Sequence, residues 1–343
     1  MMDAMTRATA PGAVGATITG GRAALGVVAV LHVVAFALLA HGVGAGGTGL
    51  AASAVIAYTL GLRHALDADH LCMIDNSTRK FVADGRPSAA VGLAFSAGHS
   101  TVVFAASVLV LAGVGWVSGA LDEGSSLRGT LGVVGATVAA TYLLAMAMTN
   151  TPVLVRAWRS LRAGGSEPEG HHLRGGISRL LATPLAGVRR PWQIYLFGLL
   201  FGLGFDTASS VALLILATGA SAGAPLAGLL ALPLLFAAAM TLGDSLNAFL
   251  MVSMYTSAHR RRRARYDVVI TSVSIAAAVA IALITYAQLG VDLGIDLDPL
   301  RWVAGIDTEW AGAGLLVFFA VVGAVAALLA AAGARTGRSL TES

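Results

Sequence analysis

The chain has 343 residues, of which 57% are hydrophobic and only 12% are charged. Soluble domains carry about 25% charged residues, so this composition excludes an ordinary soluble protein. The length therefore measures a number of membrane spans rather than a number of soluble domains. The single cysteine excludes an intrachain disulfide bond.

Long apolar stretches recur along the whole chain, and a stretch of about 20 such residues is typical of a bilayer-spanning helix. We therefore predict an all-α integral membrane protein with about eight transmembrane helices. The predicted spans cover residues 23–43, 50–73, 88–115, 130–150, 192–218, 225–254, 267–289 and 311–333. Residues 23–333 would form a single polytopic membrane domain between a tail at 1–22 and a tail at 334–343.

Basic residues are unevenly distributed among the connecting segments. Most of the 22 Lys and Arg residues fall in the two tails, after the second span, in the long loop at about 155–191 and in the HRRRRAR stretch at 259–265. The connections on the opposite side are mostly acidic. Since cytoplasmic segments are enriched in Lys and Arg, both termini and the long loop are predicted to be cytoplasmic. This asymmetry explains the net charge of +4 without a nucleic-acid partner.

The second predicted span contains the stretch LGLRHALDADH at residues 60–70. Each ionisable group at mid-bilayer costs about 2.5–3.5 kcal/mol on insertion scales, so such groups indicate a functional site. On an ideal helix His64, Asp67 and His70 form one stripe, because they are spaced three residues apart. Asp69 points elsewhere, so a single ion held by His64, Asp69 and His70 requires local unwinding, which is tolerated where backbone lines a protein cavity.

Two imidazoles with carboxylates favour a divalent transition metal, since imidazole suits nickel, copper and zinc better than it suits magnesium or calcium. The alternative is a buried salt-bridge network that only holds the helices together. Two residues nearby are ambiguous from sequence alone. His32 fits either a polar cavity or a bond to a neighbouring helix, and Cys72 fits either a soft ligand or a small core residue.

Three further spans each place one ionisable residue beside glycine and a hydroxyl group. His99 lies in FSAGHST of the third span, Asp206 in GLGFDT of the fifth and Asp244 in MTLGDSLN of the sixth. Glycine allows close backbone approach, and hydroxyl groups can orient a neighbouring ligand. SAGHS and TLGDS also resemble each other at an offset of three spans. This likeness is compatible with an inverted-topology repeat of spans 1–3 and 4–6.

The four motifs together resemble those of the nickel/cobalt transporter family. RHALDADH is similar to the second-helix signature H-A-x-D-A-D-H of that family, and FSAGHSTVV, LGFDTASS and LFAAAMTLGDSLNAFLM are similar to its later motifs, in the same order. The resemblance covers nearly all of the chain outside the tails. It implies high-affinity uptake of Ni²⁺ or Co²⁺ across a bacterial cytoplasmic (inner) membrane, with no ATPase subunit, no enzymatic activity and no cofactor beyond the transported ion.

The resemblance also implies which residues handle the metal. The signature positions carry over to His64, Asp67, Asp69, His70, His99, Asp206 and Asp244. The chain departs from the family pattern where an acidic residue is common and Ser210 stands here, and where Asp-Gly is common and Asn247-Ala248 stand here. These departures bear on the choice between nickel and cobalt and on any coupling to protons.

Two rival functions are compatible with a metal site in a membrane. An exporter would use the same residues in the opposite direction, and metal-efflux relatives often carry a long His-rich loop, whereas this chain has only His171-His172. An intramembrane metalloprotease would be expected to show H-E-x-x-H, a motif that is absent from the chain. Uptake is therefore the preferred hypothesis.

Overall fold

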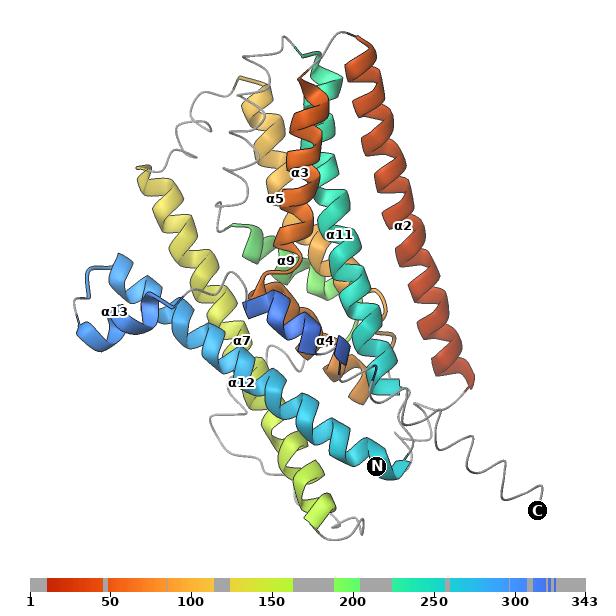
Figure 1. The fold of residues 1–343 in the computed structure, drawn as a ribbon, viewed down its shortest axis with the longest axis vertical. Coiled ribbons are helices and arrows are strands. Elements are labelled where there is room, and N and C mark those ends of the chain that lie inside the picture. Colours follow the sequence, from red (N-terminus) through yellow and green to blue (C-terminus); the bar gives the residue numbers. More distant parts are fainter. Residues whose placement is uncertain are drawn as a thin grey trace.

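The computed structural model describes residues 11–45, 49–84, 86–113, 124–162, 188–203, 224–256, 260–295, 297–306, 311–318, 320, 321 and 324. Within these ranges the regular structure is helical (Figure 1). The helices are α2 (Pro11–Gly44), α3 (Leu50–His64), α4 (Ala68–Ala83), α5 (Val91–Leu111), α7 (Ser126–Arg162), α9 (Ile194–Gly202), α11 (Leu226–Thr256), α12 (Arg260–Asp292) and α13 (Asp298–Ala304). A 3-10 turn, η1 (Pro191–Gln193), precedes α9, and residues 311–318 form a further helical segment.

Several of these helices are built to cross a bilayer. Among the described residues, 5 helices are long and apolar enough, and they contain the spans Gly21–Gly44, Val91–Leu111, Ser126–Arg159, Leu226–Ser253 and Val268–Asp292. The outward face of α2 exposes large apolar side chains such as Val30 and Val33, which suits contact with lipid. The prediction of an all-α membrane protein is confirmed. The number of eight spans and the inverted repeat stay predictions.

The element boundaries differ from the predicted ones in an informative way. The predicted span 50–73 is two helices, α3 and α4, and α4 continues to Ala83. α2 begins within the predicted tail, α7 runs into the predicted loop as far as Arg162, and α13 was not predicted. Hydropathy locates the stretch that fits the hydrocarbon layer, whereas helical hydrogen bonding continues beyond it, so helix ends are poorly defined by apolar pattern.

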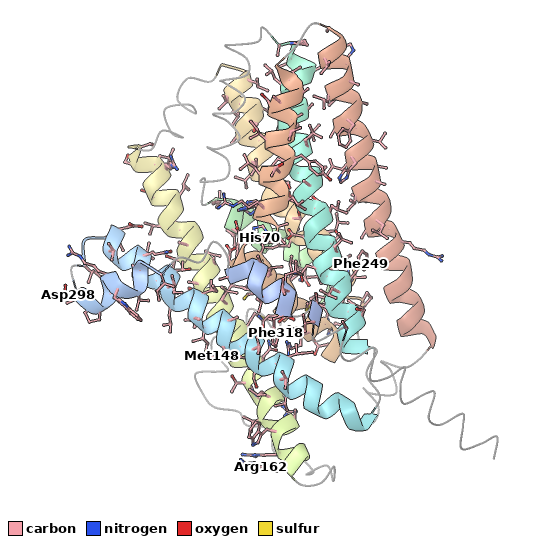
Figure 2. All side chains as sticks on the ribbon, viewed as in Figure 1. His70, Met148, Arg162, Phe249, Asp298 and Phe318 are labelled. Atoms are coloured by element: carbon pink, nitrogen blue, oxygen red, sulfur yellow. The ribbon has the colours of Figure 1, made fainter. Side chains whose placement is uncertain are left out.

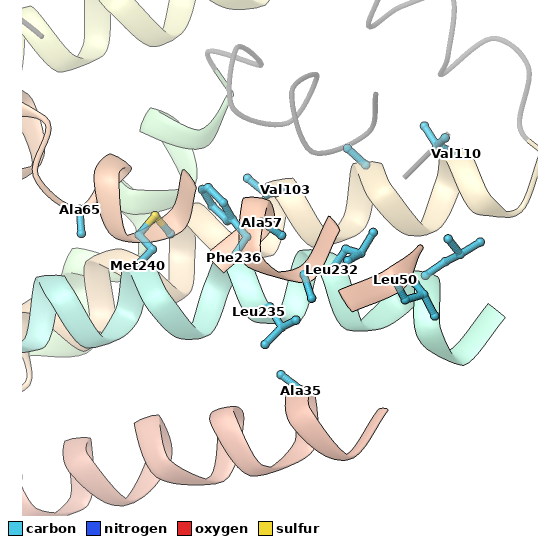
Figure 3. Packing of buried hydrophobic residues seen from close by; sticks show 13 residues of the cluster. Ala35, Leu50, Ala57, Ala65, Val103, Val110, Leu232, Leu235, Phe236 and Met240 are labelled. Carbon is cyan, nitrogen blue, oxygen red and sulfur yellow. The ribbon is translucent and has the colours of Figure 1, made fainter. Parts of the chain in front are cut away.

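One group of helices is organised around α11, which packs against α2, α3 and α5 (Figure 3). The buried cluster between them includes Ala35 of α2, Leu50 of α3, Val103 of α5 and Phe236 of α11. Alanine is frequent in this cluster, and small residues let membrane helices approach closely.

A second group consists of α7 and α12, with α13 folded back on the end of α12 (Figure 1). α4 contacts α11 of the first group and both α7 and α12 of the second. A buried cluster containing Leu71 of α4, Leu143 of α7, Ile281 of α12 and Leu315 of the segment 311–318 joins these parts. α4 therefore lies where the two groups meet.

The middle of α4 contains a buried polar layer that the sequence pattern did not predict. Arg79 was assigned to a connecting segment, but its side chain is buried inside the bundle. Its Nη2 donates to Oδ2 of Asp75 at 3.3 Å and to Oγ of Ser274 at 2.7 Å, and its Nη1 donates to Thr271. The ion pair with Asp75 on α4 and the bonds to Thr271 and Ser274 on α12 compensate a charge that would otherwise be too costly to bury.

Candidate metal centre

The helix of the second span is broken in the middle of the RHALDADH motif. α3 ends at His64, α4 begins at Ala68, and Asp67 adopts an extended conformation with φ −64° and ψ 141°. The last turn of α3 is closed by hydrogen bonds from the backbone N–H of Leu66 to Arg63 and from Asp67 to His64. The local distortion that the motif predicted is therefore present. We call residues 65–67 the joint.

Three imidazoles meet beside the joint. They come from α3, α4 and α5. The ring centroids of His64 and His70 are 4.5 Å apart, those of His64 and His99 are 4.8 Å apart and those of His70 and His99 are 5.0 Å apart. One potential ligand atom from each ring lies within 4.8 Å of the others, and we call these residues the histidine cluster. Figure 2 shows His70 in the middle of the bundle.

The spacing inside the histidine cluster suits a shared ion. Nε2 of His64 lies 3.1 Å from Nε2 of His99. Metal–imidazole bonds are about 2.1 Å long, so two imidazole nitrogens on one ion lie roughly 3 Å apart. An ion between these rings would thus need little rearrangement of the two side chains.

Two of the three imidazole rings are hydrogen-bonded to carboxylates. Nδ1–H of His64 donates to Oδ2 of Asp67, a residue of the joint, at 2.7 Å. Nδ1–H of His70 donates to Oδ2 of Asp244 on α11 at 3.4 Å. A carboxylate in this position fixes the ring orientation and raises the basicity of the other ring nitrogen. Asp67 and Asp244 are therefore placed to orient ligands rather than to bind the ion themselves.

The remaining predicted site residues are placed differently. Asp69 is partly buried, and its Oδ1 accepts a hydrogen bond from the backbone N–H of His70 at 2.9 Å, so the carboxylate is used at the start of α4. It is not part of the ligand group identified among the described residues. Asp206 and Ser210 lie outside the described residues. Asn247 is buried on α11, and neither of its amide atoms has a hydrogen-bond partner among the described residues.

The side chains of the site differ in burial: one side is partly exposed, and the other, which we call the closed side, is buried. His70 and Asp244 are fully buried and His99 is 4% exposed, whereas the side chains of His64 and Asp67 are 20% and 35% exposed. Within the described part of the chain, Nε2 of His70, Nδ1 of His99 and Oδ1 of Asp244 have no hydrogen-bond partner. A buried polar atom without a partner costs about 1–3 kcal/mol, and a cation in the histidine cluster would supply a partner for the lone pair on Nε2 of His70.

Glycine allows α5 to approach its neighbours closely around His99. Gly98 of α5 and Gly198 of α9 pack against each other's helix, so a Cβ atom on Gly98 would overlap the carbonyl oxygen of Tyr195 and one on Gly198 that of Phe95. Ser96 of α5 also donates to Thr241 of α11 at 3.1 Å. This hydroxyl pair links α5 to α11, whereas Thr101 and Thr241 also donate to carbonyl groups one turn earlier in their own helices.

The two ambiguous residues are also resolved by their contacts. Nε2 of His32 lies 3.2 Å from the hydroxyl group of Tyr58 on α3, so His32 bonds to a neighbouring helix. Cys72 is buried in the apolar cluster that joins α4, α7 and α12. It behaves as a small core residue there.

Comparisons with known proteins identify the family of the chain. The family model described as high-affinity nickel-transport protein matches residues 50–330. The chain is 38% identical over 302 residues to the nickel transporter NicT of Mycobacterium tuberculosis, covering 84% of this chain and 79% of that protein. It is 35% identical to the nickel transporter NixA of Staphylococcus aureus, covering 89% and 92%. It is 38% identical to the cobalt transport protein NhlF of Rhodococcus rhodochrous, covering 75% and 77%.

No solved structure shows a significant match to this chain. The family assignment therefore depends on the match over residues 50–330 and on relatives that are at least 35% identical over more than two thirds of the chain. The four motifs recognised in the sequence lie inside the matched region. The chain belongs to the family of high-affinity nickel-transport proteins.

Proposed function

We propose that this chain takes up Ni²⁺ or Co²⁺ across the bacterial cytoplasmic membrane through the histidine cluster. The observation that carries the proposal is the meeting of His64, His70 and His99 at a helix break in a chain with membrane-spanning helices. Imidazole-rich sites suit nickel and cobalt, and relatives are named nickel transporters or, in one case, a cobalt transport protein.

The burial pattern supports an order of events at the site. The ion enters from the exposed side of His64 and Asp67, loses water and binds the three imidazoles. Asp244 balances charge behind His70 from the closed side. We assign Asp69 and Asp206 to the same task of balancing charge or passing the ion inward.

The distribution of charge supports an orientation of the chain, and the membrane potential supplies a driving force for entry. Residues 23–333 form the membrane domain, with the tails at 1–22 and 334–343 and the loop at about 155–191 in the cytoplasm. A membrane potential that is negative inside favours entry of a divalent ion by about 4.6 kcal/mol per 100 mV, twice the value for one charge. The chain acts as a transporter without an ATPase subunit, without a cofactor beyond its ion and without enzymatic turnover.

The test measures uptake of radiolabelled nickel and cobalt in cells that lack their own importers. His64→Ala should reduce the initial rate at low metal concentration at least tenfold, because the cluster loses a ligand that the other two imidazoles cannot replace. His41→Ala is the matched control, since His41 is exposed near the end of α2. An uncoupler should lower uptake by the wild-type chain.

Two results would contradict the proposal. Uptake at the wild-type rate by His64→Ala would show that the histidine cluster is not the transport site. A fall in cellular metal on expression of the wild-type chain would identify an exporter, the rival function with the same site.

A further inference from the structure

The joint needs support from its surroundings because its backbone is not helical. Residues 65–67 connect His64 at the end of α3 to His70 in the first turns of α4, so their path sets the separation of two imidazoles. Irregular backbone at membrane depth persists where protein packs around it. The neighbours of the joint therefore bear on the geometry of the metal site.

The helical segment 311–318 packs directly on the joint. Gly312 is buried, and a Cβ atom built on it would overlap the carbonyl oxygen of Leu66 and lie 2.8 Å from N of Ala68 and 2.9 Å from C of Asp67. These are backbone atoms, so no side-chain rotation can make room. Three residues later, Leu315 packs in the same cluster as Ala68.

α11 supports the joint as well. A Cβ atom on Gly243 would lie 2.6 Å from Cβ of Ala65, and the next residue is Asp244, which bonds to His70. Two helical elements thus contact the joint through glycine. Only α11 also contributes a charged group that bonds to the histidine cluster among the described residues.

We infer that Gly312 is a positioning residue for the metal site: it lets the helical segment 311–318 pack on the backbone of Leu66–Ala68 and so fixes the separation of His64 and His70. This inference rests on the proposed function of the histidine cluster. It gives the segment 311–318 a role in metal binding although none of its side chains belongs to that cluster.

Gly312→Ala should displace the joint by a distance that a metal site does not tolerate. A productive site holds its ligands to within about 0.5 Å, and loss of groups that orient metal ligands weakens binding about 10- to 100-fold. We expect a Kd for Co²⁺ at least tenfold higher in the purified full-length protein. We also expect a changed visible absorption spectrum of bound Co²⁺ and a raised KM for uptake.

Gly314→Ala is the matched control, because it makes the same chemical change two residues away. Gly314 is exposed, lines an apolar groove of about 360 Å³ and has no heavy atom of the described chain within 4 Å of its built Cβ atom. We expect its Kd, spectrum and KM to stay within twofold of the wild-type values. Leu315→Ala is a second control, since it loosens the same segment without adding a group against the joint.

The outcomes separate positioning from a general structural effect. A purely structural role would lower the amount of folded protein and the maximal rate in Gly312→Ala and Leu315→Ala alike, with Kd and spectrum unchanged. That result, or a wild-type Kd in Gly312→Ala, would overturn the inference. If the wild-type protein bound neither Co²⁺ nor Ni²⁺, the proposed function itself would fail.

A measurement on the wild-type protein covers the case in which Gly312→Ala does not fold. Amide hydrogen exchange is measured in the purified protein with and without Co²⁺. If the segment and the joint are coupled, the ion should slow exchange in peptides from residues 62–70 and in peptides from residues 311–318 together. Slower exchange in 62–70 alone would refute the inference.

Discussion

Asp244 contributes the carboxylate that reaches the histidine cluster from a helix outside it. It is fully buried, and its Oδ2 lies 3.4 Å from Nδ1 of His70. The two residues are 174 positions apart, so the contact depends on the packing of α4 against α11. A carboxylate behind an imidazole raises the affinity of that ring for a cation, and its removal typically costs 10- to 100-fold in metal affinity.

Asp244→Asn tests this contribution with little change in shape. The amide oxygen can still accept a hydrogen bond from His70, but the negative charge that increases the basicity of the ring is lost. We expect the KM for nickel uptake to rise about tenfold or more while the amount of protein in the membrane stays close to wild type. Uptake kinetics over a range of nickel concentrations, normalised by immunoblot, measure both quantities.

Asp298→Asn is the control for Asp244→Asn, because Asp298 is exposed at the start of α13. Its uptake kinetics should match those of the wild-type chain. An unchanged KM in Asp244→Asn would mean that the contact to His70 does not tune the metal site.

The helix α4 contributes both to the histidine cluster and to a buried ion pair. Its first turn carries His70, and its later turns carry the buried pair Asp75 and Arg79. Removing one partner of a buried pair leaves the other charge uncompensated and costs about 3–5 kcal/mol. Exposed pairs contribute about 0–1 kcal/mol.

Arg79→Ala should therefore lower the thermal stability of the detergent-purified protein strongly. Arg86→Ala should have little effect, because Arg86 lies 3.8 Å from Asp84 at a partly exposed position. A melting curve followed by intrinsic fluorescence compares the two variants. The double variant Asp75→Asn/Arg79→Met should be more stable than Arg79→Ala, since it leaves no unpaired charge. Equal melting temperatures for all variants would contradict the role assigned to this pair.

α4 also shows what the sequence could and could not predict. Local unwinding was expected so that Asp69 could reach the same ion as His64. The break is present, but Asp69 accepts a hydrogen bond from the backbone N–H of His70 and does not join the histidine cluster. The stripe on an ideal helix placed His64 and Asp67 on one side, and the two side chains do meet, although Asp67 is extended rather than helical. The contacts of Arg79 were not predictable, since a basic residue after an apolar run is typical of a cytoplasmic loop. Its burial depends on Thr271 and Ser274, which lie far away in the sequence.

The distribution of contacts over the molecule explains why α4 is central. The group around α11 and the pair α7–α12 both contact α4. A change in the relative position of the two groups would act directly on the helix that carries His70. The sequence could place His64, His70, His99 and Asp244 within apolar spans. It could not predict which helices pack together, because lipid-facing and buried apolar residues look alike in sequence.

The ends of the helices predict an orientation for the molecule. α12 begins at Arg260 in the HRRRRAR stretch and ends at Asp292, so it runs from a basic end to an acidic end. α7 has Arg159 and Arg162 in its last turn. The bias of basic residues therefore predicts that the start of α12 and the end of α7 are cytoplasmic, and that α13 lies on the outer side.

Single cysteines introduced into a Cys72→Ser background test this orientation. Cys72 is the single cysteine of the chain and is buried, so its replacement leaves only the introduced thiol. Asp298→Cys should react with a membrane-impermeant maleimide in intact cells, because α13 is predicted to lie outside. Arg162→Cys should react only after the membrane is permeabilised. Nickel uptake by each variant shows that the labelled protein is correctly inserted. The reverse labelling pattern would contradict the orientation that the basic residues predict.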